Sequence, residues 1–238
     1  MAMLTFERLT KRRRTKHILS EVTFQARPGR ITGFLGPNGA GKTSTLRILL
    51  GLDRATSGTA LVDGRPYRTL RDPARKVGAL LDGSGAHRSR TGRAHLRWVA
   101  RSAGIDAARV EDVLELVGIA EAAGSRVATY SLGMGQRLGL ATALLGDPEM
   151  LVLDEPVNGL DPDGIRWIRG FLRDQADAGR TVLLSSHLIG ELSETVDDVV
   201  VIRAGKIVAN GPLADVTTGY RNLEDAFFAA IGQRSADR

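Results

Sequence analysis

The chain has 238 residues, of which 42% are apolar, 5% aromatic and 25% charged, and its net charge is +6 at pH 7. This length and apolar content exclude disorder and favour an α/β protein with a core of Leu, Val, Ile and Ala. The absence of cysteine excludes disulfide frameworks, cysteine-bound metals and thiol nucleophiles. No uncharged apolar run reaches the roughly 18 residues of a membrane span, and Glu7 and Arg8 interrupt any signal peptide. We therefore expect a soluble intracellular protein.

The first part of the chain predicts strands, a glycine-rich loop and a helix. Apolar and polar residues alternate from Val22 to Ala26, and Pro28-Gly29 marks a turn. Three glycines follow the next apolar run, after which Leu46–Leu50 supplies the apolar side of a helix that ends at Gly51. The predicted strands are 22–26, 31–35, 59–62 and 77–81. The strand 59–62 is expected to be the first strand of a short hairpin that turns at Asp63-Gly64.

The second part changes from a helical pattern to buried strands. Apolar residues at Val110, Val113, Leu114 and Val117 have helical spacing, and Gly118 is a plausible stop. Buried strands are then expected at 151–153, 181–184 and 199–202, the first two with polar residues directly after them. Open α/β sheets bind their ligands at the carboxyl ends of strands. A single domain with a helical insert is the simplest interpretation.

Charged and titratable residues outside these patterns are assigned to the surface. The basic run Lys11–Arg14 could contact nucleic acid or anionic lipid, but such a run is usually a solvated loop. His17, His87 and His95 are likewise expected at the surface.

The strongest chemical signal is the sequence Gly-Pro-Asn-Gly-Ala-Gly-Lys-Thr, which matches the phosphate-loop pattern G-x-x-x-x-G-K-[ST]. Its glycines allow backbone N–H groups to surround phosphate oxygens, while the lysine reaches the β and γ phosphates and the threonine hydroxyl can bind magnesium. The strand before the loop and the helix after it are the context that this motif requires. The expected phosphate-binding residues are Gly36, Pro37, Asn38, Gly39, Ala40, Gly41, Lys42, Thr43 and Ser44.

Two further segments supply groups that a phosphate-transfer site needs. Asp154 and Glu155 follow an apolar strand, where the first can hold magnesium and the second can polarise an attacking water. Ser131 and Gly133 precede an apolar helix, whose amino terminus offers free N–H groups to an anion. In isolation this second segment could be an ordinary helix cap.

Together these segments resemble the ATP-binding subunit of an ATP-binding cassette (ABC) transporter over nearly the whole chain. In that family the glycine loop is Walker A, the strand ending in Asp-Glu is Walker B, and the Ser-Gly segment between them is the signature. Residues 158–161, Asn-Gly-Leu-Asp, resemble the family's D-loop, and His187 stands where the family has its switch histidine. The family order of five motifs carries the resemblance.

The resemblance implies a P-loop NTPase fold: a RecA-like mixed α/β sheet core in one domain, 1–238, with a helical subdomain at about 87–140. It implies a head-to-tail dimer in which Walker A of one subunit and Ser131 and Gly133 of the other hold each ATP. Glu155 would be the general base, His187 the γ-phosphate contact and Asp161 a dimer contact. Thr43, Asp154 and the position of Asp82 would serve the magnesium ion.

Three features depart from the family pattern. Leu132 and Met134 replace a Gly and a Gln of the signature, as in the export subfamilies of the bacitracin-resistance type. Asp82 stands where the family has a Gln loop, and a shorter, charged side chain could still approach magnesium. Arg13 replaces the aromatic residue that usually stacks on adenine, and a guanidinium plane can also stack on a base.

The sequence therefore favours a Mg-ATP hydrolase that powers an export-type transporter through a separate membrane-spanning permease, at the inner face of the cell membrane. We expect a second ATP-binding subunit, in a homodimer that ATP induces. We expect no nucleic-acid partner. Import is the first alternative. A chromosome-maintenance or DNA-repair protein would need long heptad arms between its motifs, and a ribosome-acting translation factor would carry two cassettes. A non-hydrolysing ATP switch is a further alternative, and Glu155 argues against it.

Overall fold

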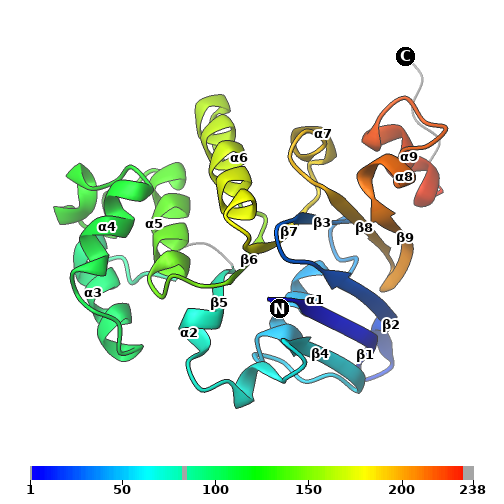
Figure 1. Cartoon of the computed structure of the whole chain (residues 1–238), viewed down its shortest axis with the longest axis horizontal. Helices are drawn as coiled ribbons and strands as arrows, with labels where there is room; N and C mark the ends of the chain where they lie inside the picture. Colours follow the sequence, from blue (N-terminus) through cyan, green and yellow to red (C-terminus); the bar gives the residue numbers. More distant parts are fainter. Residues whose placement is uncertain (1, 82–84, 233–238) are drawn as a thin grey trace.

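The computed structural model describes residues 2–81 and 85–232. Within these residues the chain forms a three-stranded and a six-stranded sheet, with helices around them (Figure 1). The smaller sheet has the order β2-β1-β4 and the larger one β5-β6-β7-β3-β8-β9. The strands are β1 (Leu4–Arg13), β2 (Lys16–Ala26), β3 (Ile31–Leu35), β4 (Ser57–Val62), β5 (Val77–Leu80), β6 (Met150–Asp154), β7 (Thr181–Ser186), β8 (Asp198–Arg203) and β9 (Lys206–Pro212).

The helices follow the strands in an α/β order. Helix α1 packs between the two sheets, and α3 to α5 form a group at one side of the molecule (Figure 1). The helices are α1 (Lys42–Leu49), α2 (Pro73–Lys76), α3 (Gly92–Ser102), α4 (Arg109–Leu116), α5 (Leu132–Leu144), α6 (Pro162–Asp177), α7 (Ile189–Leu192), α8 (Leu213–Val216) and α9 (Leu223–Ala230), with the short 3-10 turns η1 (Tyr67–Thr69), η2 (Glu121–Gly124) and η3 (Val127–Thr129).

The inner strands of the six-stranded sheet, β3, β6, β7 and β8, are buried on both faces, which explains why they are mostly apolar runs. β3 pairs in parallel with β7 and β8, β5 with β6, and β6 with β7, whereas β9 is antiparallel to β8. Leu151 and Leu153 of β6 face one core cluster, and Val152 faces the other, which also contains α1. Burying each such side chain contributes about 1.5–3 kcal/mol. The predicted mixed α/β sheet is confirmed.

The predicted helical pattern at 110–117 is also confirmed. α4 buries Val110, Val113 and Leu114 on one face, and Gly118 follows the helix with φ of 70°. Because this left-handed conformation suits glycine, the helix ends where the sequence predicted.

The N-terminal region differs from the prediction. Lys11–Arg13 belong to β1 rather than to a loop, and the turn to β2 lies at Arg14, whose φ is 54°. Lys11 also forms an ion pair with Asp53, with its Nζ 2.5 Å from the carboxylate. The basic run therefore lies mostly along a strand that the pairing with β2 and β4 fixes in place.

The expected hairpin at 59–64 was only partly right. β4 pairs with β1, far upstream in the sequence, from Leu4 opposite Val62 to Thr10 opposite Ser57. After the turn at Asp63-Gly64 the chain makes a single bridge, between Val62 and Arg65. β4 is thus paired with a strand that is distant in the sequence. Local sequence patterns do not reveal such a partner.

The surface assignment of His95 was wrong, whereas His17 and His87 are exposed as expected. His95 lies on α3 with 4% of its surface exposed, and its Nε2 is 3.3 Å from Thr142 Oγ1 on α5. The Thr142 hydroxyl donates to Leu138 O, so His95 Nε2–H is the donor of this bond. Burial, together with the charge of Arg90, lowers the pKa of His95. The neutral ring is therefore part of the packing between α3 and α5.

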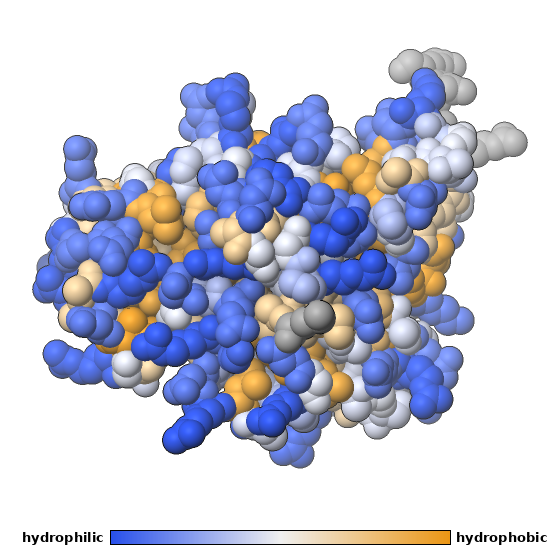
Figure 2. All heavy atoms as spheres, in the orientation of Figure 1, coloured by the Kyte–Doolittle hydropathy of each residue, from blue (hydrophilic) through white to orange (hydrophobic). Residues whose placement is uncertain are grey.

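The surface is mostly hydrophilic on the face that Figure 2 shows, with apolar side chains in small separate patches. Among the described residues no helix combines the length and the apolarity needed to cross a bilayer. Near the C-terminus α9 buries Leu223, Ala226 and Phe227.

Candidate functional site

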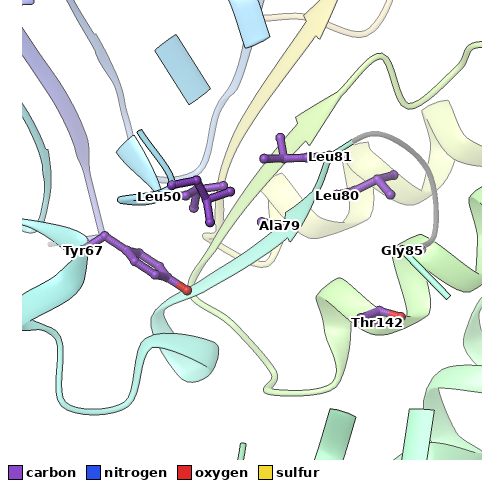
Figure 3. A pocket seen from close by; sticks show the side chains of 9 residues that line it. Leu50, Tyr67, Ala79, Leu80, Leu81, Gly85 and Thr142 are labelled. Carbon is purple, nitrogen blue, oxygen red and sulfur yellow. The ribbon is translucent and has the colours of Figure 1, made fainter. Parts of the chain in front are cut away.

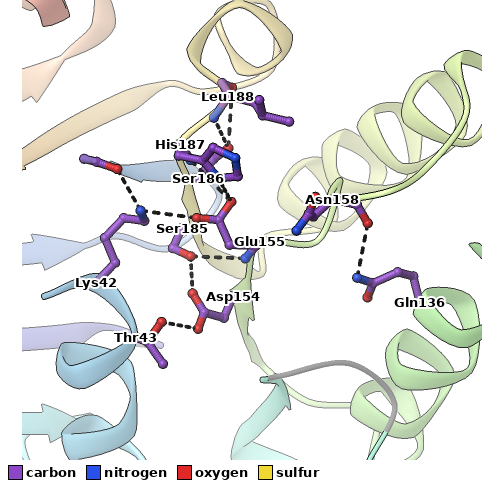
Figure 4. Close-up of polar contacts among 11 residues, drawn as sticks. Lys42, Thr43, Gln136, Asp154, Glu155, Asn158, Ser185, Ser186, His187 and Leu188 are labelled. Carbon is purple, nitrogen blue, oxygen red and sulfur yellow. Dashed lines mark hydrogen bonds and ion pairs between the residues drawn. The ribbon is translucent and has the colours of Figure 1, made fainter. Parts of the chain in front are cut away.

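The polar residues predicted at strand ends meet at one edge of the large sheet. β3 lies beside β7, and β7 beside β6, all in parallel. The loop after Leu35, the pair Asp154-Glu155 and the segment Ser185–His187 therefore start from the same edge. Figure 4 shows the side chains from these three segments pointing toward one another.

The phosphate loop is held in shape by its glycines and leads into a helix with free N–H groups. A Cβ on Gly36 would lie 2.4 Å from the carbonyl oxygen of Ile202, so no other residue fits without movement. Gly41 is the N-cap of α1 with φ of 115°, and no side chain caps this helix or adds an acid to its first turn. An uncapped helix N-terminus attracts an anion through its N–H groups and its dipole. The loop thus has the form of a phosphate-binding site.

Lys42 connects this loop to the Glu155 carboxylate. Its side chain is 6% exposed, and Nζ donates to Gly36 O at 2.7 Å. The same Nζ lies 3.2 Å from Glu155 Oε1. His187 Nδ1 lies 2.8 Å from Glu155 Oε2, so the carboxylate accepts from the ring and the other ring nitrogen is left for a further contact (Figure 4). Of the predicted residues, Lys42 and His187 are therefore both in direct contact with Glu155.

A second cluster joins the loop to Asp154. Thr43 Oγ1 donates to Asp154 Oδ2 at 2.7 Å, and Ser185 Oγ donates to Asp154 Oδ1. A hydroxyl and a carboxylate are oxygen ligands of the kind that hard divalent cations take. No group of three or more acidic, histidine or cysteine side chains that could hold a metal by itself occurs in the described part of the chain. A cation here would take ligands from the nucleotide and water as well.

Ser185 is a site residue that sequence analysis missed. Its hydroxyl also accepts from the backbone N–H of Glu155 at 3.1 Å, and it is fully buried. Glu155 has φ of 49°, a left-handed conformation that costs a non-glycine residue on the order of 1–2 kcal/mol. Ser185 thus orients Asp154 and helps to hold the turn that aims the Glu155 carboxylate. The signal for this role is the pairing of Asp154 with Ser185 across β6 and β7, which the sequence alone does not show.

Other predicted residues lie outside this cluster. Ser131 caps α5 by accepting from Met134 N at 3.2 Å, and Asp161 caps α6 by accepting from Gly164 N at 2.7 Å. Within the described residues no hydrogen bond links Ser131 or Gly133 to the phosphate loop. The roles of Ser131, Gly133 and Asp161 at a dimer interface stay predictions.

Two predicted nucleotide contacts also remain untested. Arg13 is exposed at the end of β1, and its stacking on adenine stays a prediction. Asp82 lies outside the described residues.

An apolar pocket lies beside the edge strand β5, between this strand, α5 and the segment around η1 (Figure 3). Leu52, one of its lining residues, is 58% exposed. Burial raises the pKa of Tyr67, so its hydroxyl stays neutral at physiological pH. The pocket lacks a charged side chain among the described residues that line it, which are Leu50, Leu52, Tyr67, Ala79, Leu80, Leu81, Gly85, Gly139 and Thr142.

A phosphate loop, an adjacent acidic pair and a histidine at the edge of a parallel sheet define an ATPase of the P-loop class. The ABC transporter family model matches residues 19–158, more than half of the chain. The chain belongs to this family, as an ATP-binding and ATP-hydrolysing subunit.

Individual relatives agree with this assignment. An uncharacterized ABC transporter ATP-binding protein of Bacillus subtilis is 39% identical over 98% of this chain and 76% of its own length. The bacitracin transport ATP-binding protein of Bacillus licheniformis is 39% identical over 86% of this chain and 68% of its own length. A solved structure of an ATP-binding subunit of an ABC transporter superimposes with a TM-score of 0.85 at 26% identity, covering 96% of this chain and 99% of that one.

Proposed function

We propose that this chain hydrolyses Mg-ATP and powers an export-type transporter whose membrane-spanning part is a separate subunit. The contact of Lys42 and His187 with the two oxygens of Glu155 carries this proposal. It supports the proposal because a carboxylate, a cation and an imidazole ring lie together beside the phosphate loop. The signature variant with Leu132 and Met134 and the likeness to a bacitracin transport protein support export.

The chemistry assigned to these residues is transfer of the γ-phosphoryl group to water. The loop N–H groups and Lys42 would bind the phosphates, and Glu155 would accept the proton of the attacking water. With a proton on each ring nitrogen, His187 would donate through Nδ1 to Glu155 and through Nε2 toward the γ phosphate. Thr43 and Asp154 would hold the magnesium ion, which supplies charge neutralisation of the phosphate oxygens.

We assign the N-terminus of α5 to the ATP of a second copy. Ser131 and Gly133 make no hydrogen bond to the phosphate loop within the described residues, yet they open a helix of 13 residues whose dipole favours an anion. A head-to-tail pair of chains would bring each of these helix ends to the partner's phosphate loop. Each of the two sites would then need both subunits.

Mixing two inactive variants tests this arrangement. Lys42→Ala removes the phosphate loop's cation and Ser131→Arg blocks the signature, so each variant alone should lack turnover. In an equimolar mixture half of the dimers are mixed, and each mixed dimer has one intact site. We expect the mixture to regain about a quarter of the wild-type ATP turnover if chains pair at random and sites act independently.

The matched control carries both substitutions on one chain. Mixed with either single variant, this double variant forms no intact site and should recover no turnover. Equal recovery in the control, or none in the test mixture, would overturn the head-to-tail arrangement. Turnover is measured as phosphate release, with light scattering to follow the dimer.

We further propose that the membrane-spanning subunit docks at the apolar pocket of Figure 3. The pocket is open and apolar, and the exposed side chain of Leu52 lines it. A surface that binds an apolar segment of a partner needs these features. Leu52→Asp should leave the ATP turnover of the isolated chain unchanged and abolish co-purification of the membrane subunit. Leu116→Asp, at an exposed leucine elsewhere, is the matched control. Normal co-purification of Leu52→Asp would contradict this docking site.

A further inference from the structure

The N-terminus of α5 packs on the segment 158–161, which we call the D-loop. Leu132, the first residue of α5, is 65% exposed. A Cβ on Gly159 would nevertheless lie 2.0 Å from Leu132 Cδ2. The leucine side chain therefore covers the Gly159 backbone. Gly159 has φ of 75°, a backbone conformation that favours glycine, and a Cβ there would displace the end of the Leu132 side chain.

Two further contacts extend this packing. Gln136 Nε2 donates to Asn158 O at 3.4 Å, as Figure 4 shows. A Cβ on Gly133 would lie 3.5 Å from Leu160 Cδ2. The first two turns of α5 thus follow the D-loop along its length.

The D-loop is tied directly to the catalytic base. Asn158 N donates to Glu155 O at 3.1 Å, and Leu160 N donates to Val157 O at 3.2 Å. At its other end Asp161 caps α6. Because the segment is short and held at both ends, a shift of Gly159 is transmitted to the turn at Glu155.

We propose that Leu132 is a positioning residue for ATP hydrolysis. Its side chain holds Gly159 and thereby the D-loop and the orientation of the Glu155 carboxylate. The leucine takes over a position where the family pattern has glycine, so in this chain the signature helix supports the D-loop through a side chain. This inference rests on the proposed Mg-ATP hydrolysis.

Four variants of the full chain test the contact by steady-state ATP turnover. Leu132→Ala should lower kcat about five- to tenfold and leave the ATP concentration for half-maximal turnover unchanged, whereas Leu132→Met, which can still cover Gly159, should keep kcat within about twofold. Gly159→Ala should lower kcat more than Leu132→Ala, because its Cβ meets the leucine. The double variant should recover at least about threefold over Gly159→Ala, because the clash is gone.

Controls separate positioning from folding and from the proposed function. Leu116→Ala, at an exposed leucine at the end of α4, should leave kcat unchanged, and thermal unfolding is compared for all variants. Wild-type kcat in Leu132→Ala, or a double variant no faster than Gly159→Ala, would overturn the inference alone. A wild-type chain without turnover would overturn the proposed function and this inference with it.

Discussion

Replacing Glu155 by Gln should lower ATP turnover about 100- to 1,000-fold while ATP still drives dimer formation. Gln keeps the size of the side chain and can accept from His187 Nδ1, but its amide cannot take a proton from water. The left-handed turn at Glu155 and the bond from its backbone N–H to Ser185 are unaffected by the change. The substitution therefore removes the base and leaves the backbone geometry of the site in place.

Phosphate release and light scattering with and without ATP measure the two effects. Glu149→Gln is the matched control, because Glu149 is also an acid paired with a lysine, Lys76, but lies at the opposite end of β6. It should retain turnover within about twofold. Turnover of Glu155→Gln at the wild-type rate would show that another group is the base.

Most of the candidate site could be predicted because its residues follow parallel strands of the same sheet, directly or after the phosphate loop. The phosphate-loop pattern identified Lys42 and Thr43, and an apolar strand ending in two acids identified Asp154 and Glu155. Ser185 could not be found in this way. Its role depends on β7 lying beside β6, and serine at the end of a strand is an ordinary residue.

The features of β1 and His95 that the sequence analysis missed also depend on contacts between segments that are distant in the sequence. The two-residue period of β1 is broken where its register shifts between Phe6 and Leu9, so its inward residues do not alternate strictly. The charges at Lys11–Arg13 further mask the strand. His95 is buried by α5, which comes later in the chain. The contact with Thr142 explains how a polar ring fits there.

Replacing Lys42 by Ala should weaken ATP binding by at least about 100-fold, or about 2.7 kcal/mol. The ammonium group is nearly buried between Gly36 O and the Glu155 carboxylate, so its removal leaves that carboxylate without its cation beside the phosphate loop. A negative carboxylate facing the phosphates would then repel them, in addition to the loss of the direct contact. Lys42→Arg should also weaken ATP binding, because a planar guanidinium does not fit the space of a compact ammonium.

Lys76→Ala is the control for this effect. Lys76 also pairs with a glutamate, at 2.6 Å, but it is 38% exposed and lies on α2. Its loss should leave ATP affinity within about twofold, because exposed ion pairs contribute about 0–1 kcal/mol. Titration calorimetry with Mg-ATP compares the three variants. Binding by Lys42→Ala at near wild-type affinity would mean that the loop N–H groups alone hold the phosphates, and Lys42 would then act only in the transfer step.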